Sequence, residues 1–307
     1  MEVTRIDLKD WEYYGEGGSS TSYINKLDGN KILKLSNVGI PVRITEKEYL
    51  ASKSFFEMGL PSPAVYDFVT DGERFGYTGQ RIKSKLSFAR ILSQEPDNVE
   101  CLAKRFACQA LDLHRIQADV TKMAAAREIL LEKMDHLPDL PDDVMESVRK
   151  CFTSIADVTT VLHGDMNPGN LITFEGRDSW IGVNELTYGD PFLDIATMHV
   201  ICHFLPGKTV SRLYHADRKS LKSFYEAFLK AYFGEEWESE EIRKHIHDAA
   251  VVRFCAMAAG NPEYLSLLVP LVRGRKVMFM IRRWTLKPAL SLTTSSNAGS
   301  KRGFNHP

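Results

Sequence analysis

Hydrophobic and polar residues alternate with a period of two in short runs over roughly the first 80 residues. The clearest run is 30–35, Asn-Lys-Ile-Leu-Lys-Leu, in which Ile32 and Lys34 fall on one face of a predicted strand. Glycine turns at 14–18 and 27–30 separate short strand-like runs, and the second turn is typical of a hairpin. A further strand is predicted at 75–82. This region is therefore predicted to be a small β-rich unit.

One helix is predicted within the β-rich unit, over residues 45–58. Thr45 stands where an N-cap is expected, and Glu48 follows three residues later, as in a capping box. Gly59 and Pro61 then end the helical pattern.

From about residue 85 the apolar positions recur with the spacing of amphipathic helices. Long helices are predicted at 98–117, 217–233 and 239–259. The segment 161–181 differs, because it combines loop residues with two short apolar runs around a turn at 175–178. A loop followed by a hairpin is predicted there.

The pattern gives three parts: an N-terminal lobe over 1–82, a mostly helical C-terminal lobe over 83–290, and a tail over 291–307. The tail is rich in Ser, Asn and Gly, so it is predicted to be disordered. A chain of 307 residues, 44% of them hydrophobic, is long enough to bury a full core.

Composition narrows the choice of partners and of compartment. The net charge of −1 gives no electrostatic reason to expect a nucleic-acid or membrane partner, and no run has the length of a membrane span or a signal peptide. The five cysteines are scattered and form no CxxC pair, which predicts thiols buried as small hydrophobes in a reducing cytoplasm.

The string His163-Gly164-Asp165-Met166-Asn167-Pro168-Gly169-Asn170 is the main candidate for chemistry. A tight loop between Asp165 and Asn170 would aim both side chains into one cleft. Asp165 can accept the proton of a substrate hydroxyl, and Asn170 can offer its amide oxygen to magnesium on a nucleotide phosphate. His163 is expected to brace the loop by hydrogen bonds.

A second group of residues fits nucleotide binding. Glycines in the run 15–20 free backbone N–H groups for phosphate oxygens, although a turn of this kind is by itself more often a plain hairpin. Lys34 follows on a strand and can reach the α- and β-phosphates if a carboxylate holds it. Glu48 is the expected partner, with Glu46 as the competitor.

Two further patterns stand after the catalytic string. In Gly189-Asp190-Pro191-Phe192-Leu193-Asp194, Asp190 is expected to accept hydrogen bonds from backbone or from the catalytic loop, and Asp194 to cap a helix. His199 and His203 share a helix face at zinc-ligand spacing, but no third ligand is evident, so a helix packed beside the substrate cleft is preferred.

Taken in order, these residues resemble the aminoglycoside phosphotransferase and choline kinase family over roughly 10–285. His163-Gly164-Asp165 with Asn170 resembles its HGDxxxxN loop, and 189–194 its GDPxxD element. The resemblance implies an α+β fold with two lobes, like that of protein kinases. It also implies ATP or GTP and Mg²⁺ as cofactors, and a small molecule with a hydroxyl as substrate.

The resemblance further assigns roles by position. The nucleotide would lie against the glycine loop, the lysine–glutamate pair and a hinge, formed by Gly15, Gly17, Gly18, Ser19, Lys34, Glu48, Gln80 and Ile82. Asp165 would be the catalytic base and Asn170 a metal ligand.

The sequence departs from the family at Gly182, where the family has a magnesium-binding Asp. Phosphoryl transfer depends on neutralising the moving phosphate, so this loss bears on activity. Glu185 is the first choice as a substitute ligand. The alternatives are Asn184, Asp178 or Asn170 alone.

Two functions follow from the sequence. One is an ATP-dependent kinase of a small molecule, favoured by the presence of Lys34, Glu48, Asp165 and Asn170. The other is a pseudokinase that binds nucleotide or metabolite without efficient transfer, favoured by Gly182. Neither the acceptor, the choice of ATP or GTP, nor the oligomeric state follows from the sequence.

Overall fold

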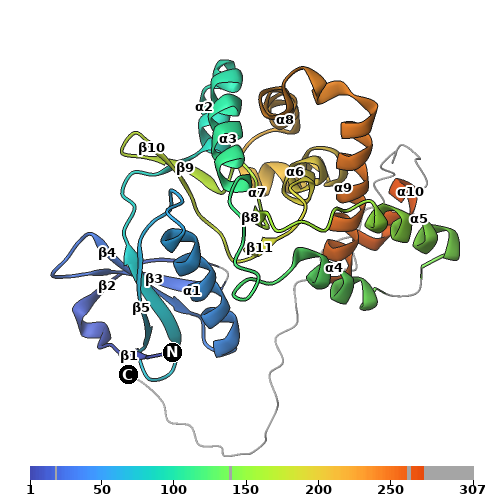
Figure 1. Ribbon diagram of the computed structural model, residues 1–307. Helices are drawn as coiled ribbons and strands as arrows, with labels where there is room; N and C mark the ends of the chain where they lie inside the picture. Colours follow the sequence, from blue (N-terminus) through green and yellow to red (C-terminus); the bar gives the residue numbers. More distant parts are fainter. Residues whose placement is uncertain (18, 138–139, 261–263, 273–307) are drawn as a thin grey trace, which may run out of the picture. The chain divides into compact units, whose positions relative to one another are not determined.

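The computed structural model describes residues 1–17, 19–137, 140–260 and 264–272, which all lie in one structural unit, Met1–Lys276 (Figure 1). Gly18 and the predicted tail 291–307 lie outside the described residues. The strands are β1 (Thr4–Arg5), β2 (Trp11–Glu16), β3 (Ser20–Asn25), β4 (Lys31–Ser36), β5 (Val65–Thr70), β6 (Phe75–Gln80), β7 (Leu86–Ser87), β8 (Val161–Leu162), β9 (Leu171–Phe174), β10 (Arg177–Trp180) and β11 (Thr187–Tyr188).

The α-helices are α1 (Val42–Glu57), α2 (Phe88–Gln94), α3 (Val99–His114), α4 (Ala126–Asp135), α5 (Asp142–Thr153), α6 (Phe192–His199), α7 (Gly207–Tyr214), α8 (Arg218–Phe233), α9 (Glu240–Gly260) and α10 (Leu265–Val272). Short turns of other helix types are η1 (Leu8–Asp10), η2 (Pro96–Asn98), the π-helix η3 (Val200–Phe204) and η4 (Gly234–Glu238). No helix among the described residues is both long and apolar enough to cross a membrane.

A six-stranded sheet occupies the N-terminal region in the order β1-β5-β6-β4-β3-β2, with β1 parallel to β5 and the other pairs antiparallel. Strand β4 alternates as its sequence predicts: Leu33 and Leu35 are fully buried, and they pack with Trp11 and Val69. The predicted β-rich unit and the hairpin at 27–30 are confirmed.

The first glycine turn is placed differently from the prediction. Tyr14, Gly15 and Glu16 belong to β2, where a bulge separates Tyr13 from Gly15, so the chain turns later, just before Ser20. The pairing of β2 with β3 extends this far because Gly15 is opposite Ser22 and Glu16 is opposite Thr21.

The prediction that Thr45 caps a helix is wrong. Helix α1 already begins at Val42, after Pro41, and the buried Thr45 hydroxyl pairs with that of Ser36 at 2.6 Å. Pro41 sets the start, since its fixed φ suits the residue that enters a helix. The predicted end is confirmed: α1 stops at Glu57, and Gly59 has a φ of +78°.

The rest of the described chain is mostly helical, and its predicted long helices are confirmed as α3, α8 and α9. Phe106 of α3 lies at the centre of their core. Its ring makes edge contacts, with centroids 5.3–5.5 Å apart, to Trp180, Phe224 and Phe228. The mixed architecture of a β-sheet region and a helical region is that of the predicted fold class.

The loop and hairpin predicted at 161–181 are confirmed, with β9 and β10 paired in register. The turn needs only Glu175 and Gly176, both with positive φ, so Arg177 and Asp178 already belong to β10. The expectation for cysteines is only partly met: all five are free and Cys202 and Cys255 are buried, but Cys101 and Cys108 are exposed.

Candidate active site

The predicted catalytic string forms a tight loop between β8 and β9. Gly164 is required in it, because its φ is +84° and a β-carbon there would meet the Glu185 carbonyl oxygen at 1.9 Å. The next residue, Asp165, follows this close approach of two backbones. The loop conformation therefore depends on a residue without a side chain immediately before the candidate base.

Asp165 lies within a small network of amides. Its Oδ1 accepts a hydrogen bond from Asn167 Nδ2 at 3.0 Å, and its Oδ2 accepts one from Asn170 Nδ2 at 2.9 Å. Each oxygen keeps a further acceptor site for a substrate hydroxyl. Burial raises the pKa of Asp165, although His163 and the two amides act in the opposite direction.

Asn167 was not singled out by the sequence, and its role depends on the loop geometry. Its side chain is almost fully buried, and its Oδ1 accepts from the Gly169 N–H at 2.9 Å while its Nδ2 donates to Asp165. It therefore fixes the orientation of the carboxylate from one side as Asn170 does from the other.

His163 braces the loop, as expected. Its Nδ1 accepts from the Asp165 N–H at 3.2 Å, so Nε2 carries the proton that is donated to the Ile181 carbonyl, 3.1 Å away. Burial lowers the pKa of His163, which keeps the ring neutral in this arrangement.

Asp194 anchors the catalytic loop, and the prediction that it caps a helix is wrong. Its carboxylate accepts from the backbone N–H groups of His163 at 2.7 Å and Gly164 at 2.9 Å. The side chain is fully buried. Burial alone would raise its pKa, but His114 and Arg253 outweigh this effect and hold the pKa of Asp194 below its usual value.

Two residues of this anchor were missed from the sequence. His114 Nε2 lies 3.3 Å from Asp194, and Arg253 on α9 donates to the carbonyl oxygens of Gly164 at 2.7 Å and Leu193 at 3.0 Å. An arginine inside the apolar run 249–258 was the available signal, since such a charge is rarely buried without partners.

Asp190 has the capping role instead. Its Oδ1 accepts from the Phe192 N–H at the start of α6, and its Oδ2 accepts from the Ala156 N–H at 2.8 Å. His245 also lies 2.9 Å from this carboxylate. The part of the prediction that Asp190 accepts from nearby backbone is confirmed, whereas the contact with the catalytic loop belongs to Asp194.

Gly182 directly faces Asn170. Its φ is +74°, and a β-carbon built on it would come 2.8 Å from Asn170 Oδ1 and 3.2 Å from Asn170 Nδ2. Because Asn170 Nδ2 donates to Asp165, Oδ1 is the side-chain atom left for a ligand. The position at which the resemblance led us to expect a metal carboxylate is therefore next to the oxygen that the Asn170 side chain offers.

The substitute ligands predicted for magnesium are placed as follows. Glu185 packs its backbone against Gly164, and its side chain is 45% exposed, with Oε2 3.9 Å from Lys133. Asp178 makes a double ion pair with Arg105, and Asn184 is exposed. No group of three or more His, Cys, Asp or Glu within the described ranges is arranged to hold a metal.

Lys34 and Glu48, which were predicted to bind the nucleotide, lie next to each other at the sheet. Lys34 Nζ forms an ion pair with Glu48, and Tyr77 donates to the same Glu48 oxygen at 2.8 Å. Glu48, and not Glu46, is therefore the partner of the lysine. Tyr77 was missed, and burial together with Glu48 raises the pKa of its hydroxyl.

The glycine hairpin lies across the sheet from this pair. In the strand register Gly15 is opposite Ser22, and Ser22 is opposite Lys34, so the three form one row over β2, β3 and β4. Neighbouring strands are about 4.8 Å apart, which places Gly15 about 10 Å from Lys34.

Asn37 holds the base of the hairpin. Its N–H donates to Ser19 O at 2.9 Å, and its Nδ2 lies 3.4 Å from Gly17 O. The predicted hinge residues follow elsewhere on the sheet: Gln80 ends β6, opposite Lys31, and Ile82 comes just after it.

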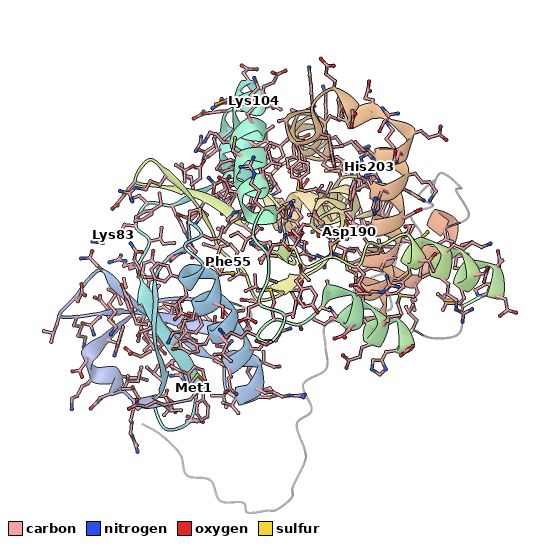
Figure 2. All side chains as sticks on the ribbon, viewed as in Figure 1. Met1, Phe55, Lys83, Lys104, Asp190 and His203 are labelled. Carbon is pink, nitrogen blue, oxygen red and sulfur yellow. The ribbon has the colours of Figure 1, made fainter. Side chains whose placement is uncertain are left out.

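Helix α1 connects the two groups. It carries Glu48 near its middle and Phe55 near its end (Figure 2). The fully buried Phe55 ring makes an edge contact with His163, with ring centroids 6.2 Å apart. Backbone contacts reinforce the connection, since Trp180 N–H donates to Pro61 O at 2.7 Å. The position of Glu48 is thus tied to the loop that carries Asp165.

His199 and His203 stack on each other with ring centroids 4.4 Å apart, and His199 Nδ1 lies 3.3 Å from the Tyr225 hydroxyl. Burial lowers the pKa of both rings, to about 4 for His203, with Lys222 acting in the same direction. Stacked rings share a face without converging on a common point, so a packing role is the better interpretation.

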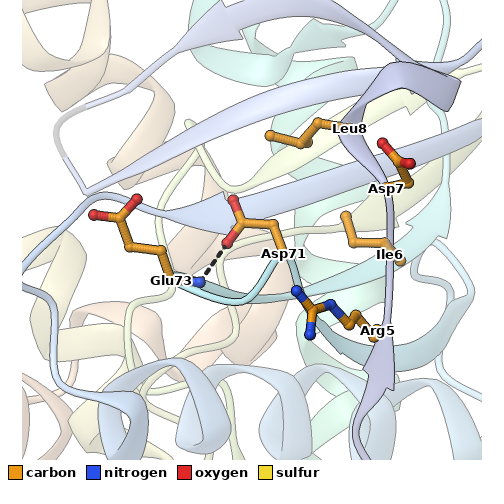
Figure 3. A pocket seen from close by; sticks show the side chains of 6 residues that line it. All are labelled: Arg5, Ile6, Asp7, Leu8, Asp71 and Glu73. Carbon is orange, nitrogen blue, oxygen red and sulfur yellow. Dashed lines mark hydrogen bonds between the residues drawn. The ribbon is translucent and has the colours of Figure 1, made fainter.

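A pocket beside the sheet is separate from both the catalytic loop and the residues predicted to bind the nucleotide. It is lined by Arg5, Ile6, Asp7, Leu8, Asp71 and Glu73 (Figure 3). Its Asp71 carboxylate already accepts from the Glu73 N–H at 3.0 Å and from Arg74 Nε at 2.9 Å. None of the residues predicted for the site lines it.

Comparison with known families decides the classification. The model of the phosphotransferase enzyme family, whose short name is APH, matches residues 10–243. The chain belongs to this family. The match spans strands β2 to β6 of the sheet, the Lys34–Glu48 pair and the catalytic loop, which confirms the resemblance drawn from the sequence.

Solved structures of phosphotransferases share the fold. An aminoglycoside phosphotransferase APH(4)-Ia, in a complex with ADP and hygromycin B, is 12% identical, with a TM-score of 0.61 and coverage of 86% of this chain and 93% of that one. A choline/ethanolamine kinase family protein from Mesorhizobium loti is 13% identical, with a TM-score of 0.54 and coverage of 86% of each chain. A search of curated proteins finds no match.

Proposed function

We propose that this protein is an ATP-dependent phosphotransferase that acts on a hydroxyl of a small molecule. The observation that carries the proposal is the position of Asp165, whose two oxygens are oriented by Asn167 and Asn170 while each keeps an acceptor site. Membership of the phosphotransferase family supports it, as do structural neighbours solved with ADP or ATP.

The nucleotide is proposed to lie along the row formed by Gly15, Ser22 and Lys34. The hairpin is proposed to cover the phosphates with backbone N–H groups, and Lys34, held by Glu48, to contact the α- and β-phosphates. The Gly17 N–H donates to Ser20 O at 2.8 Å, so this bond must open if Gly17 is to contact a phosphate oxygen. The hairpin residues proposed for this role are Gly15, Gly17, Gly18 and Ser19. Gln80 and Ile82 are proposed to contact the base, of either ATP or GTP.

Asp165 is proposed to orient the acceptor hydroxyl and to take its proton as the γ-phosphoryl group moves. Burial raises its pKa, which makes the carboxylate a better proton acceptor than an exposed one. The phosphoryl group passes directly and in line to the acceptor oxygen, without a phosphoenzyme.

The described residues fit magnesium only in part. Asn170 Oδ1 is a suitable oxygen ligand, but Gly182 beside it supplies no carboxylate, and magnesium prefers one or two carboxylates with phosphate and water. Glu185 remains the proposed second ligand, for which it must leave Lys133. When bound, magnesium would neutralise charge on the phosphates.

A second function is favoured by the Gly182 geometry alone. A protein without the metal carboxylate can bind a nucleotide or a metabolite and transfer phosphate poorly. In that case Asn167 and Asn170 would still hold Asp165, but turnover would be low for every acceptor.

The test is ADP release with ATP and magnesium across a panel of aminoglycosides, amino alcohols, sugars and nucleosides. Aminoglycosides are included because neighbours have been solved with streptomycin and gentamicin. We expect acceptor-dependent ADP release in the wild type and its loss in Asp165→Asn, with ATP binding unchanged in a thermal-shift assay. Nucleotide binding without release for any acceptor would favour the second function.

Compartment and partners are proposed from composition. Five free cysteines are the basis for proposing a cytoplasmic protein. The formal charge of −1 is the basis for proposing no nucleic-acid partner.

A further inference from the structure

Arg218, the first residue of α8, has two buried nitrogens without a partner. Neither Nε nor Nη2 forms a hydrogen bond to any of the described residues, although both atoms are closed off from solvent. A buried guanidinium normally pairs with an anion or with carbonyl oxygens. The nearby Asp217 does not serve, because its carboxylate caps α8 through the N–H groups of Lys219 and Ser220.

The start of α7 lies against this guanidinium. A β-carbon on Gly207 would be 4.0 Å from Arg218 Nε, and Gly207 has no side chain to fill the space. Pro206 precedes α7 and offers no side-chain cap. The first turn of a helix has N–H groups without intrahelical acceptors and a positive dipole end, so it attracts an anion.

The surroundings carry excess positive charge. Lys222 lies one turn after Arg218 on the same helix face. Burial lowers the pKa of His203, and Lys222 and Arg218 both act in the same direction. Between residues 199 and 226 the sequence has five Lys and Arg and two acids, Asp217 and Glu226. Neither Arg218 Nε nor Arg218 Nη2 has a carboxylate partner among the described residues.

We propose that Arg218 and the first turn of α7 form a binding site for a phosphate group. A phosphate dianion can accept two hydrogen bonds from the guanidinium fork and others from helix N–H groups. Lys222 adds a second positive charge. The phosphate is either part of the acceptor molecule or free in solution, and the two sources share the same recognition chemistry.

Helix α7 connects this phosphate site with the catalytic loop. At its other end the Tyr214 ring lies 3.6 Å from the place of a β-carbon on Gly169. Burial raises the pKa of the Tyr214 hydroxyl, and the Asp165 charge adds to this effect. A helix of this length spans about 10 Å. An acceptor that reaches both sites would carry its hydroxyl about that far from its phosphate.

The site is tested without nucleotide, so the result does not depend on the proposed kinase activity. The full chain is titrated with sodium phosphate by calorimetry, against sodium chloride at equal ionic strength. We expect wild-type binding to weaken about 10–100-fold in Arg218→Gln, less in Arg218→Lys, and not at all in the exposed control Lys219→Gln. Equal binding by wild type and Arg218→Gln, or no binding by the wild type, overturns the proposal.

Two further variants separate this phosphate site from the nucleotide site. Gly207→Asp places a carboxylate beside Arg218 at a helix start, so it should stabilise the fold and abolish phosphate binding. Gly207→Asn adds a side chain of similar size without charge, so it should bind phosphate more strongly than Gly207→Asp does. Lys34→Ala should bind phosphate normally. Loss of binding in Lys34→Ala with retention in Arg218→Gln would place the ion at the nucleotide site and overturn the proposal.

The source of the phosphate is then distinguished by comparing glycerol 3-phosphate and ribose 5-phosphate with glycerol, ribose and orthophosphate. An acceptor phosphate predicts that an ester binds more tightly than orthophosphate and loses this advantage in Arg218→Gln. Free phosphate predicts that orthophosphate binds most tightly. If the esters and orthophosphate all bind as weakly as glycerol and ribose, neither an acceptor phosphate nor free phosphate is the ligand, and the proposal is overturned.

Discussion

Gly182 and Asn170 are in close approach: a β-carbon on Gly182 would lie 2.8 Å from Asn170 Oδ1. A side chain at position 182 would therefore contact Asn170, which we propose as a magnesium ligand. The φ of +74° at Gly182 adds a backbone cost for any other residue. Replacing Gly182 with the expected aspartate therefore tests both whether magnesium binding increases and whether the loop tolerates a side chain at this position.

For Gly182→Asp we expect a loss of about 1–2 kcal/mol in the free energy of unfolding, because the left-handed backbone disfavours a side chain and Asn170 must shift. We also expect magnesium to increase ATP binding more than it does in the wild type. Thermal shifts with ATP, with and without magnesium, measure both effects.

Gly182→Asn is the matched control for that variant, since it has the same size and a similar tolerance of positive φ but no charge. It should lose similar stability and gain no magnesium response. An equal magnesium response in Asn and Asp variants would show that the carboxylate is not what the site lacks.

Lys34→Ala should weaken ATP binding about 10–100-fold, because it removes a charged donor to the phosphates and leaves the Glu48 carboxylate near them without its cation. Lys31→Ala is the control on the same strand, since Lys31 pairs with Asp67 instead. Equilibrium binding of ATP measures the difference. Similar affinities for the two variants would remove Lys34 from the nucleotide site.

Asp194→Asn should lower the free energy of unfolding by roughly 3–5 kcal/mol, because it leaves Arg253 and two loop N–H groups around a buried position without their charge partner. Denaturant unfolding gives the value, with Asp97→Asn as an exposed control. A loss no larger than that of the control would mean that the anchor contributes little to stability.

Stability should fall as the pH decreases below about 6.5, in part because His199 is buried. Its folded pKa lies well below the unfolded value, so the unfolded chain binds more protons in this range, and acid favours unfolding. The free energy of unfolding of His199→Phe should decline less between about pH 6.5, the ordinary pKa of His, and about pH 5. Unfolding midpoints of both proteins across this range provide the comparison, and parallel curves would exclude His199 as a contributor.

The sequence by itself determined the elements whose geometry depends on near neighbours. The alternation in β4, the turn at Glu175-Gly176 and the amphipathic pattern of α8 each follow from spacing along the chain. The catalytic string was recognisable for the same reason, because Asp165, Asn167 and Asn170 contact each other within one loop.

Only the tertiary structure decided the partners that come from distant segments. Asp194 holds the loop through N–H groups 30 and 31 residues away, and Arg253 reaches Gly164 across 89 residues. Periodicity shows which face of a helix is buried, but not which element covers it or which buried polar groups meet there. For that reason the sequence identified the candidate base, whereas its anchor and the unpaired Arg218 required the packed helices.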